Sequence, residues 1–544
     1  MQDPCDDGDL VLGGGRVHTL DAGRPQAEAL WIRGGSIAAA GTDDEILSAA
    51  PAGARRIALE GACVLPGLVD AHLHFEGFAL GLTRIDADLP RLQDVLAAVR
   101  ERAAAAPPGD WILGHGWNHN RWGSGEWPTR QLLDGAAPDH PVFLTAKSGH
   151  ASWANTAALD AAGVTRRSPD PPGGTVVRDG TGEPTGVFLE EASGLVAGRL
   201  PEVTAEQAAD AMAAALPTAW ACGLTGVHDL DGIRALRAWQ ILRERGHRGL
   251  RVCKSIPASR LDEAVGTGLR SGFGDDTLWI GGVKLFADGA LGPRTAWMLA
   301  PYENEPDNLG MPLMTPEELR ETVTRASRHG LACFVHAIGD RANREALDAL
   351  ALARAEEPAG GRRLRHRIEH VQVIDPQDAP RFAELQVIAS VQPVHATSDY
   401  PMVDRFWGPE RAPWAYAFES LRRAGAVLAF GSDTPVEPIP PLAGIHAAVT
   451  RRRADGSPGA EGWQPRERLS VADAVRGFTR GAAFAGGVED RLGALAPGKL
   501  ADLVVLAEDP FEADPMDLAG LPVRATMVGG RFVHADPALR LDRS

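Results

Sequence analysis

Two histidines, His72 and His74, follow a short apolar run that begins at Val64. Alternate residues of a β-strand point to the same side, so the two imidazoles would project together from the C-terminal end of the strand. Neutral imidazoles are good ligands for zinc and similar divalent metals. Alone, the pair fits two solvated or hydrogen-bonded histidines as well as half of a metal site, so its interpretation depends on further ligands downstream.

The composition limits the classes of function. The chain has 544 residues, 44% of them apolar and 23% charged, which suits one large enzyme domain with a smaller domain attached. A net charge of −17 argues against nucleic acid or an anionic membrane as a partner. The five cysteines have no paired spacing and indicate neither a disulfide framework nor a zinc ribbon. No apolar leader or membrane-spanning stretch is present, so we expect a cytoplasmic protein.

Both ends of the chain consist of short apolar segments separated by glycine turns. Residues 9–40 contain four of these segments. Residues 501–534 show the same pattern of short apolar segments, with a turn at Gly529 and Gly530. The likeness predicts one small β-sandwich domain built from residues 1–64 and 488–544. Two unrelated edge hairpins are the alternative.

Between the ends, strand segments alternate with amphipathic helical segments rich in alanine and leucine. Eight strand segments can be counted, beginning with the one that reaches His72. This alternation predicts an α/β fold with a parallel sheet closed into a (β/α)8 TIM-like barrel over residues 65–487. Residues 78–205, after the first strand, are too long for an unstructured loop and are predicted to fold as a cap over the barrel mouth.

The active site of such a barrel lies at the C-terminal ends of its strands. Those ends bring together six metal-binding or acid–base side chains: His72 and His74 on the first strand, Lys284 on the fourth, His336 on the fifth, His370 on the sixth and Asp433 on the eighth. Singly, His336 fits a near-core histidine and Asp433 a helix cap. His366 competes with His370, which is preferred because it lies at the strand end. Together the six predict a metal site.

Lys284 is the least expected member of this set. An ammonium group inside the apolar run of residues 282–286 would lose its hydration. We therefore expect its amine to be neutralised chemically or paired with Asp288.

These segments resemble those of the metal-dependent amidohydrolase superfamily, in its amidohydrolase-3 branch of YtcJ-like proteins and N-substituted formamide deformylases. The similar segments run through nearly the whole chain and comprise residues 65–74, 182–186, 283–292, 335–342, 365–370, 390–393, 431–436 and 496–506. Jointly they are specific for the branch, but the branch is diverse and they do not name a substrate.

The resemblance implies two divalent metal ions, with zinc expected. His72, His74 and Asp433 would hold the buried ion, and His336 with His370 the more exposed one. A single ion is the alternative, in which a residue of strand four or five has another role. The resemblance also implies a homodimer.

The resemblance further implies that carbon dioxide carboxylates Lys284, which would then bridge the two ions. This modification replaces a buried cation by an anionic oxygen ligand between two positive ions. It thereby accounts for a lysine in an apolar strand.

The cap is predicted to set specificity. The residues predicted to contact substrate are His150, His228, Trp117 and Trp122. His228 lies at the second strand end, where it would donate a hydrogen bond, and the tryptophans would suit an apolar N-substituent. His115 and His119 are predicted to be loop or surface residues.

The leading hypothesis is a metal-dependent amidohydrolase that cleaves the C–N amide bond of a small N-substituted formamide or N-acyl compound. Metal-activated hydroxide would attack the carbonyl, with Asp433 as general base and then general acid. A hydrolytic deaminase or cyclic-amide hydrolase on the same scaffold is the alternative. A non-catalytic regulator is a third hypothesis, against which the full ligand set argues.

Overall fold

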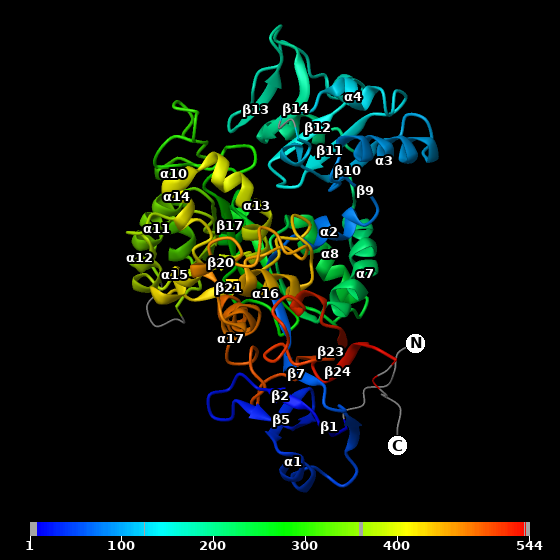
Figure 1. Ribbon diagram of the computed structural model, residues 1–544, viewed down its shortest axis with the longest axis vertical. Coiled ribbons are helices and arrows are strands. Elements are labelled where there is room, and N and C mark those ends of the chain that lie inside the picture. The colour runs from blue at the N-terminus through cyan, green and yellow to red at the C-terminus, as the bar shows by residue number, and fades with distance from the viewer. Residues whose placement is uncertain (1–7, 124–125, 358–362, 538, 540–544) are drawn as a thin grey trace.

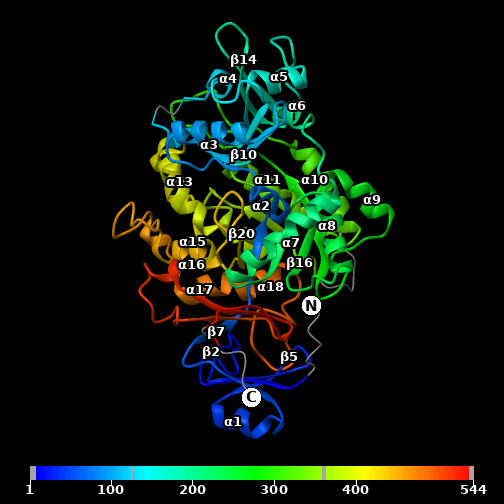
Figure 2. The same ribbon diagram turned by 90° about the vertical axis from the view of Figure 1, so that its right-hand side faces the viewer.

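The computed structural model describes residues 8–123, 126–357, 363–537 and 539. Three parts follow one another along the long axis of the molecule: a cap, a barrel and a β-sandwich that contains both ends of the chain (Figures 1 and 2). The barrel lies between the other two parts, so its strand ends face either the cap or the sandwich.

Eight parallel strands form the barrel, which confirms the predicted fold class. They pair in chain order and are β8 (Leu68–Leu73), β15 (Leu224–Asp229), β16 (Arg251–Pro257), β17 (Leu278–Phe286), β18 (Ala332–Ala337), β19 (Arg367–His370), β20 (Ile388–Val391) and β21 (Leu428–Phe430). Nearly every residue of these strands is buried, as expected for a parallel sheet covered by helices.

The first and last strands, β8 and β21, meet at a seam without ladder hydrogen bonds in the described sheet. The carboxylate of Asp70 bridges the seam by accepting from the backbone N–H of His72 and of Ser432, each at 3.0 Å. Beyond the strands, the N–H of Asp433 donates to the carbonyl of His72 at 2.7 Å. A Cβ at Gly431 would lie 2.5 Å from the His72 nitrogen, so this close approach requires glycine.

Helices surround the barrel. They are α2 (Phe75–Gly81), α7 (Ala205–Ala221), α8 (Ile233–Glu244), α9 (Leu261–Gly266), α10 (Pro316–Arg328), α11 (Asp340–Arg354), α12 (Ala379–Glu384), α13 (Pro393–Phe406), α14 (Gly408–Arg411), α15 (Phe418–Arg423), α16 (Pro441–Thr450), α17 (Val471–Arg476) and α18 (Ala482–Ala485). Capping boxes start two of the longer ones, with Thr204 and Gln207 at α7 and Thr315 and Glu318 at α10.

Two sheets from both ends of the chain form the β-sandwich. One contains β1 (Leu10–Gly13), β4 (Ala29–Arg33), β5 (Ser36–Gly41) and β6 (Arg55–Ala58). The other contains β2 (Arg16–His18), β3 (Gln26–Ala27), β7 (Cys63–Pro66), β22 (Leu503–Leu506), β23 (Val523–Val528) and β24 (Arg531–Ala535). One helix, α1 (Asp43–Ala49), lies between β5 and β6. Only Gly67 separates β7 from the first barrel strand, so the sandwich leads directly into the strand that carries His72.

The cap is a six-stranded mixed sheet with helices beside it. Its strands are β9 (Ile85–Asp86), β10 (Ile112–Trp117), β11 (Val142–Ala146), β12 (Ala151–Ala154), β13 (Gly174–Arg178) and β14 (Pro184–Glu190), and its helices are α3 (Leu92–Ala105), α4 (Arg130–Asp134), α5 (Thr156–Ala162) and α6 (Gly194–Ala197). The cap, the sandwich and the barrel each have an apolar core of their own. The residue bounds given above for the domains stay predictions.

Among the described residues, no helix combines the length and the apolar character needed to cross a bilayer.

Candidate metal centre and active-site pocket

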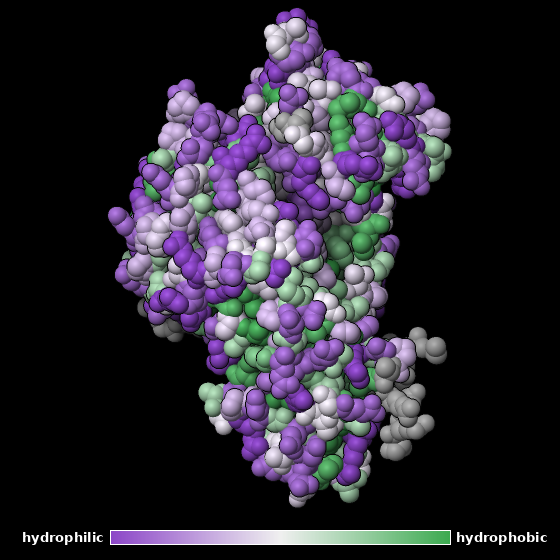
Figure 3. Space-filling model, in the orientation of Figure 1, coloured by the Kyte–Doolittle hydropathy of each residue, from purple (hydrophilic) through white to green (hydrophobic). Residues whose placement is uncertain are grey.

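A cavity of about 1380 Å³ lies between the barrel mouth and the cap. The space-filling surface is hollowed between these two parts (Figure 3). All six predicted metal-site residues line this cavity: His72, His74, Lys284, His336, His370 and Asp433. The fold therefore brings together side chains that are up to 361 positions apart between residues 72 and 433.

His72 and His74 both direct a ring nitrogen at Asp433. Nε2 of His72 lies 3.2 Å from Oδ1 of Asp433, and Nε2 of His74 lies 3.5 Å from the same oxygen. Nε2 of His72 is buried and makes no hydrogen bond. Ligand atoms of the three residues lie within 4.8 Å of one another.

The opposite ring nitrogen of each histidine faces a carboxylate. Nδ1 of His72 lies 2.7 Å from Glu369, and Nδ1 of His74 lies 3.1 Å from Asp231. Each Nδ1 therefore carries the hydrogen, and each Nε2 presents a lone pair to a carboxylate oxygen of Asp433. Lone pairs that face one another in a buried space need a cation between them, so the residues present fit a divalent metal ion.

The two supporting carboxylates are themselves held by buried cations. Nε of Arg367 lies 2.6 Å from Oε1 of Glu369. Burial alone would raise the pKa of Glu369, but Arg367 and His72 lower it below its ordinary range. The ammonium of Lys254 donates to the backbone carbonyl of Asp231, which fixes the loop that carries this carboxylate. Sequence reasoning missed these residues, because nothing in the sequence shows that their side chains face the two histidines.

His336 and His370 lie side by side on neighbouring strands, with ring centroids 4.6 Å apart. Nε2 of His336 donates to the carbonyl of Gly289 at 2.9 Å, and Nδ1 of His370 donates to Oε1 of Gln392 at 2.8 Å. These bonds leave Nδ1 of His336 and Nε2 of His370 as the nitrogens with lone pairs. Burial lowers the pKa of both imidazoles, which keeps them in the neutral form that a metal ligand needs.

His395 is a further member of the site that sequence reasoning missed. It lies in the first turn of α13, and its Nε2 is 3.2 Å from Oδ2 of Asp433. Burial alone would lower the pKa of His395, but Asp433 and Glu437 raise it to about 10. His370, His395 and Asp433 form a second group with ligand atoms within 4.8 Å of one another. The signal was present, since His395 follows the end of the seventh strand, one of the strand ends from which no metal ligand had been assigned.

Lys284 lines the pocket with its amine 4.7 Å from the ring centre of Phe286. Burial lowers the pKa of this lysine to about 8, against the opposing effects of Glu369 and Asp433. The expected pairing with Asp288 does not occur. Asp288 instead accepts from the backbone N–H groups of Trp297, Ile338 and Gly339, which orders the loop behind His336.

Backbone strain accompanies two of the predicted ligands. His370 and Asp433 have φ values of 76° and 60°, in the left-handed region that residues with a Cβ seldom adopt. Such conformations persist where surrounding contacts enforce them and are common at functional sites.

Of the four predicted substrate contacts, the structure brings His150 and Trp117 to the pocket. Nδ1 of His150 lies 2.7 Å from Glu190, and the ring of His150 lies 5.2 Å from that of His336. Burial alone would lower the pKa of His150, but Glu190 raises it above its ordinary value. Trp117 is 1% exposed and donates to the carbonyl of Leu144. It lines the pocket from the cap side.

The structure does not bring His228 and Trp122 to the pocket, and both assignments need correction. His228 is buried lower in the barrel, where NH1 of Arg367 lies 2.7 Å from its Nδ1. Trp122 packs in the cap core with its ring 6.1 Å from that of Trp153. A position near a strand end did not show that His228 lies below the barrel mouth. The aromatic character of Trp122 did not show that its ring packs inside the cap.

His115 and His119 were expected in loops or at the surface, and this expectation is wrong. His115 lies in β10, with its Nε2 3.3 Å from the carbonyl of Pro435 in the barrel. His119 is 4% exposed and stacks on Trp127 with ring centroids 4.0 Å apart. Both line the pocket from the cap side.

Comparison with known proteins places most of the chain in one family. The model of the amidohydrolase family named Amidohydro_3 matches residues 55–534, which include every metal-site residue described above.

Three relatives are similar over nearly the whole chain. Protein LONG AFTER FAR-RED 3 of Arabidopsis thaliana is 35% identical over 97% of this chain and 91% of its own length. YtcJ of Bacillus subtilis, which is named as an amidohydrolase, is 34% identical over 96% of this chain and 99% of its own. The N-substituted formamide deformylase of Arthrobacter pascens is 28% identical over 96% and 97%.

A crystal structure of a metal-dependent hydrolase from Pyrococcus horikoshii has the same fold, with a TM-score of 0.75 and 28% identity over 93% of this chain and 99% of that one. The family match, the shared fold and the buried lone pairs agree with one another. The chain therefore belongs to the amidohydrolase family and is a metal-dependent hydrolase.

Proposed function

We propose that this hydrolase cleaves the C–N amide bond of a small N-substituted formamide or N-acyl compound, with two zinc ions bridged by carboxylated Lys284. The observation that carries the proposal is the pair of imidazole lone pairs, on His72 and His74, that face one carboxylate oxygen of Asp433. The name of the Arthrobacter relative supports the substrate class.

His72 and His74, whose Nε2 atoms face Oδ1 of Asp433, would hold the first ion together with this carboxylate. His395 contacts Oδ2 of the same carboxylate. His336 and His370 would hold the second ion, with their free ring nitrogens as ligands. The pKa of about 8 at Lys284 leaves a fraction of its amine unprotonated near neutral pH, and only the neutral amine can add to carbon dioxide.

Divalent ions held by these residues would polarise the amide carbonyl and activate water for attack at neutral pH. Asp433 accepts the proton of the attacking water at Oδ2 and then donates it to the leaving nitrogen. His150, held by Glu190, donates a hydrogen bond from Nε2 to the carbonyl oxygen, which offsets the charge that develops there. The cap covers the strand ends and excludes bulk water.

The outer part of the pocket has apolar walls suited to an apolar N-substituent. The side chains that contribute to them are Phe286, Leu291, Leu313, Met314, Met402 and Val394. Phe286 is 41% exposed although it belongs to a barrel strand, and its ring therefore faces the cavity without covering. These six side chains all belong to the barrel part of the chain: Phe286 ends β17, Val394 and Met402 lie in α13, and the other three lie in the loop after β17.

The test is metal analysis together with a panel of amides, for the wild type and for Lys284→Ala. About two ions per chain are expected in the wild type, and formate or another acid plus an amine as products. Lys284→Ala should lose most of the hydrolysis and the bridged ion, and added formate or acetate should restore part of the rate. Lys499→Ala, at a lysine whose amine donates to the carbonyls of Glu489 and Leu492, is the matched control.

Each remaining hypothesis has its own outcome. Release of ammonia or ring opening would support the deaminase or cyclic-amide alternative. One ion per chain with full activity in Lys284→Ala would exclude the bridged two-ion arrangement. A metal-loaded protein without hydrolysis of any amide would support a regulatory role.

A further inference from the structure

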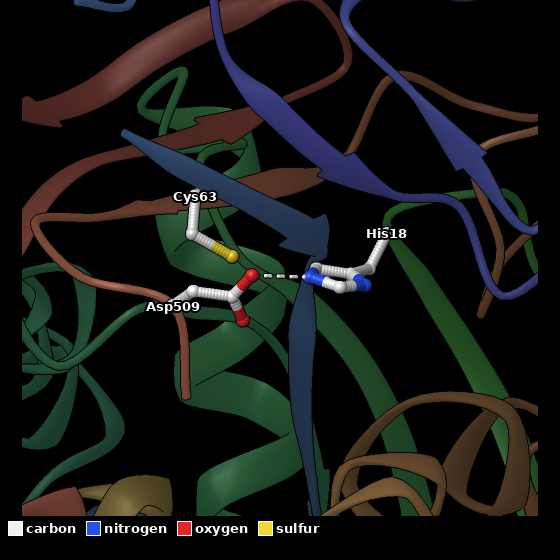
Figure 4. A group of neighbouring side chains, drawn as sticks. All are labelled: His18, Cys63 and Asp509. Atoms are coloured by element: carbon white, nitrogen blue, oxygen red, sulfur yellow. Dashed lines mark hydrogen bonds and ion pairs between the residues drawn. The ribbon is translucent and has the colours of Figure 1, made fainter. Parts of the chain in front are cut away.

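A second group of metal-binding side chains lies in the β-sandwich. His18 ends β2, Cys63 begins β7, and Asp509 follows β22. One ligand atom from each residue lies within 4.8 Å of the other two. Figure 4 shows the thiol and the imidazole on either side of the Asp509 carboxylate. None of the three is among the described residues that line the pocket between barrel and cap.

The sheet fixes where these side chains lie. Strand β7 is parallel to β2 and antiparallel to β22, with Cys63 paired to Leu506 in the register. The carboxylate of Asp509 is oriented by the N–H of Phe511, which donates to Oδ1 at 3.0 Å. Its Oδ2 is left to contact Nε2 of His18 at 2.7 Å. The ring of Phe511 packs on His18 with centroids 4.2 Å apart.

These three side chains are largely withdrawn from solvent. Cys63 is fully buried, and the side chain of Asp509 is 6% exposed. Burial raises the pKa of the Cys63 thiol, and the carboxylate of Asp509 beside it raises that pKa further. A divalent cation would reverse this repulsion, because one thiolate and one carboxylate balance its two charges. The imidazole of His18, 14% exposed, forms the side from which an ion and one water can enter.

The donor set selects the class of ion. Sulfur, imidazole nitrogen and carboxylate oxygen are all ligands of zinc, and three protein ligands with one water complete its preferred tetrahedron. Calcium and magnesium take oxygen ligands and do not use thiolate.

We propose that His18, Cys63 and Asp509 bind one zinc-class divalent ion at a structural site separate from the barrel. On binding, the thiol proton of Cys63 leaves to solvent and a sulfur–metal bond forms. The ion replaces the hydrogen bond between His18 and Asp509, whose atoms separate, and the imidazole hydrogen moves to Nδ1. The site ties β2 of the N-terminal segment to the C-terminal segment that follows β22.

The test is cobalt(II) titration of the full chain, followed by the near-ultraviolet charge-transfer absorption of a thiolate–cobalt bond. No cysteine is among the described residues lining the pocket, so cobalt bound in the barrel does not produce this band. The wild type should show the band with saturation at one equivalent of thiolate-bound cobalt. Cys63→Ser should abolish it, whereas Cys222→Ser, at a described cysteine outside the group, should retain it.

The wild-type titration tests the proposal by itself, because absence of the band in folded, cobalt-saturated protein overturns it. Persistence of the band in Cys63→Ser overturns it as well. His18→Ala changes a partly exposed side chain and should weaken the thiolate-bound cobalt by about 10-fold or more. Unchanged affinity in this variant would show that His18 is not a ligand and would overturn the three-residue site. Amide hydrolysis, read separately in the same samples, reports on the barrel site alone.

Discussion

Oε2 of Glu369 lies 2.7 Å from Nδ1 of His72, on the side of the ring opposite Asp433. A glutamine at position 369 no longer attracts the imidazole hydrogen by charge, so the ring loses its fixed tautomer. Glu369→Gln should weaken the first metal ion by about 10- to 100-fold, measured by competition with a chelator.

The matched control for that change is Glu467→Gln. Glu467 is also buried, and it accepts hydrogen bonds from the backbone and side chain of Ser420 away from the pocket. Equal metal affinities in the two variants would show that Glu369 has no special relation to the metal.

Asp433→Asn removes the carboxylate that moves the proton. We expect kcat to fall by about 10²- to 10⁴-fold in protein reloaded with metal, because an amide cannot accept the proton of the attacking water. Asp455→Asn changes another pocket aspartate, whose carboxylate accepts from the N–H of Ser457, and should leave kcat close to that of the wild type. A kcat for Asp433→Asn within a few-fold of the wild type would assign the proton transfer to another group.

Phe286→Ala tests the apolar wall. Loss of a partly buried aromatic contact is worth about 1–2 kcal/mol, so kcat/KM should fall by about 5- to 30-fold for amides with a large apolar N-substituent. Amides with a methyl group at the same position should change little. Phe273→Ala removes a phenylalanine that is 69% exposed and does not line the pocket, so it serves as control. An equal loss for small and large substituents would place Phe286 outside substrate recognition.

His119 makes the stability of the cap depend on pH. Burial, with Arg294 and Arg405 nearby, lowers the pKa of His119 to about 4 in the folded protein. The unfolded chain, with a histidine pKa of about 6.5, binds more protons between these values. Stability should therefore be lost as the pH falls from about 6.5 to about 4, by at most about 3 kcal/mol.

His119→Phe keeps the stacking on Trp127 and should remove this part of the pH dependence. Cap unfolding can be followed by the fluorescence of the cap tryptophans between pH 4 and pH 7, with His247→Phe at an exposed imidazole as control. The same acid slope in wild type and His119→Phe would mean that another group is responsible.

The strand ends of the barrel could be predicted because a buried parallel strand is an uninterrupted apolar run. A polar residue at its end, such as His336 or His370, therefore stands out. The choice of His370 over His366 agrees with the structure, in which Nδ1 of His366 accepts the N–H of Cys333 outside the pocket.

The supporting residues could not be predicted in the same way. Glu369 precedes His370, and nothing in the sequence shows that it reaches across the barrel to His72. The position of His228 one layer below the rim depends on strand stagger, which emerges only when all eight strands pair. The inward packing of Trp122 likewise depends on how the cap strands pair. The spacing of the aromatic residues in the sequence does not show which residues of these strands lie opposite one another.

Strands β8 and β21 share no ladder hydrogen bond, and members of the proposed metal site lie on both sides of this seam. His72 lies in β8 and His74 follows it, whereas Asp433 follows β21. The carboxylate of Asp70 and the hydrogen bond from the N–H of Asp433 to the carbonyl of His72 hold the two sides together. These contacts fix how far His72 lies from Asp433, so a substitution at Asp70 is expected to change metal binding although it removes no proposed ligand.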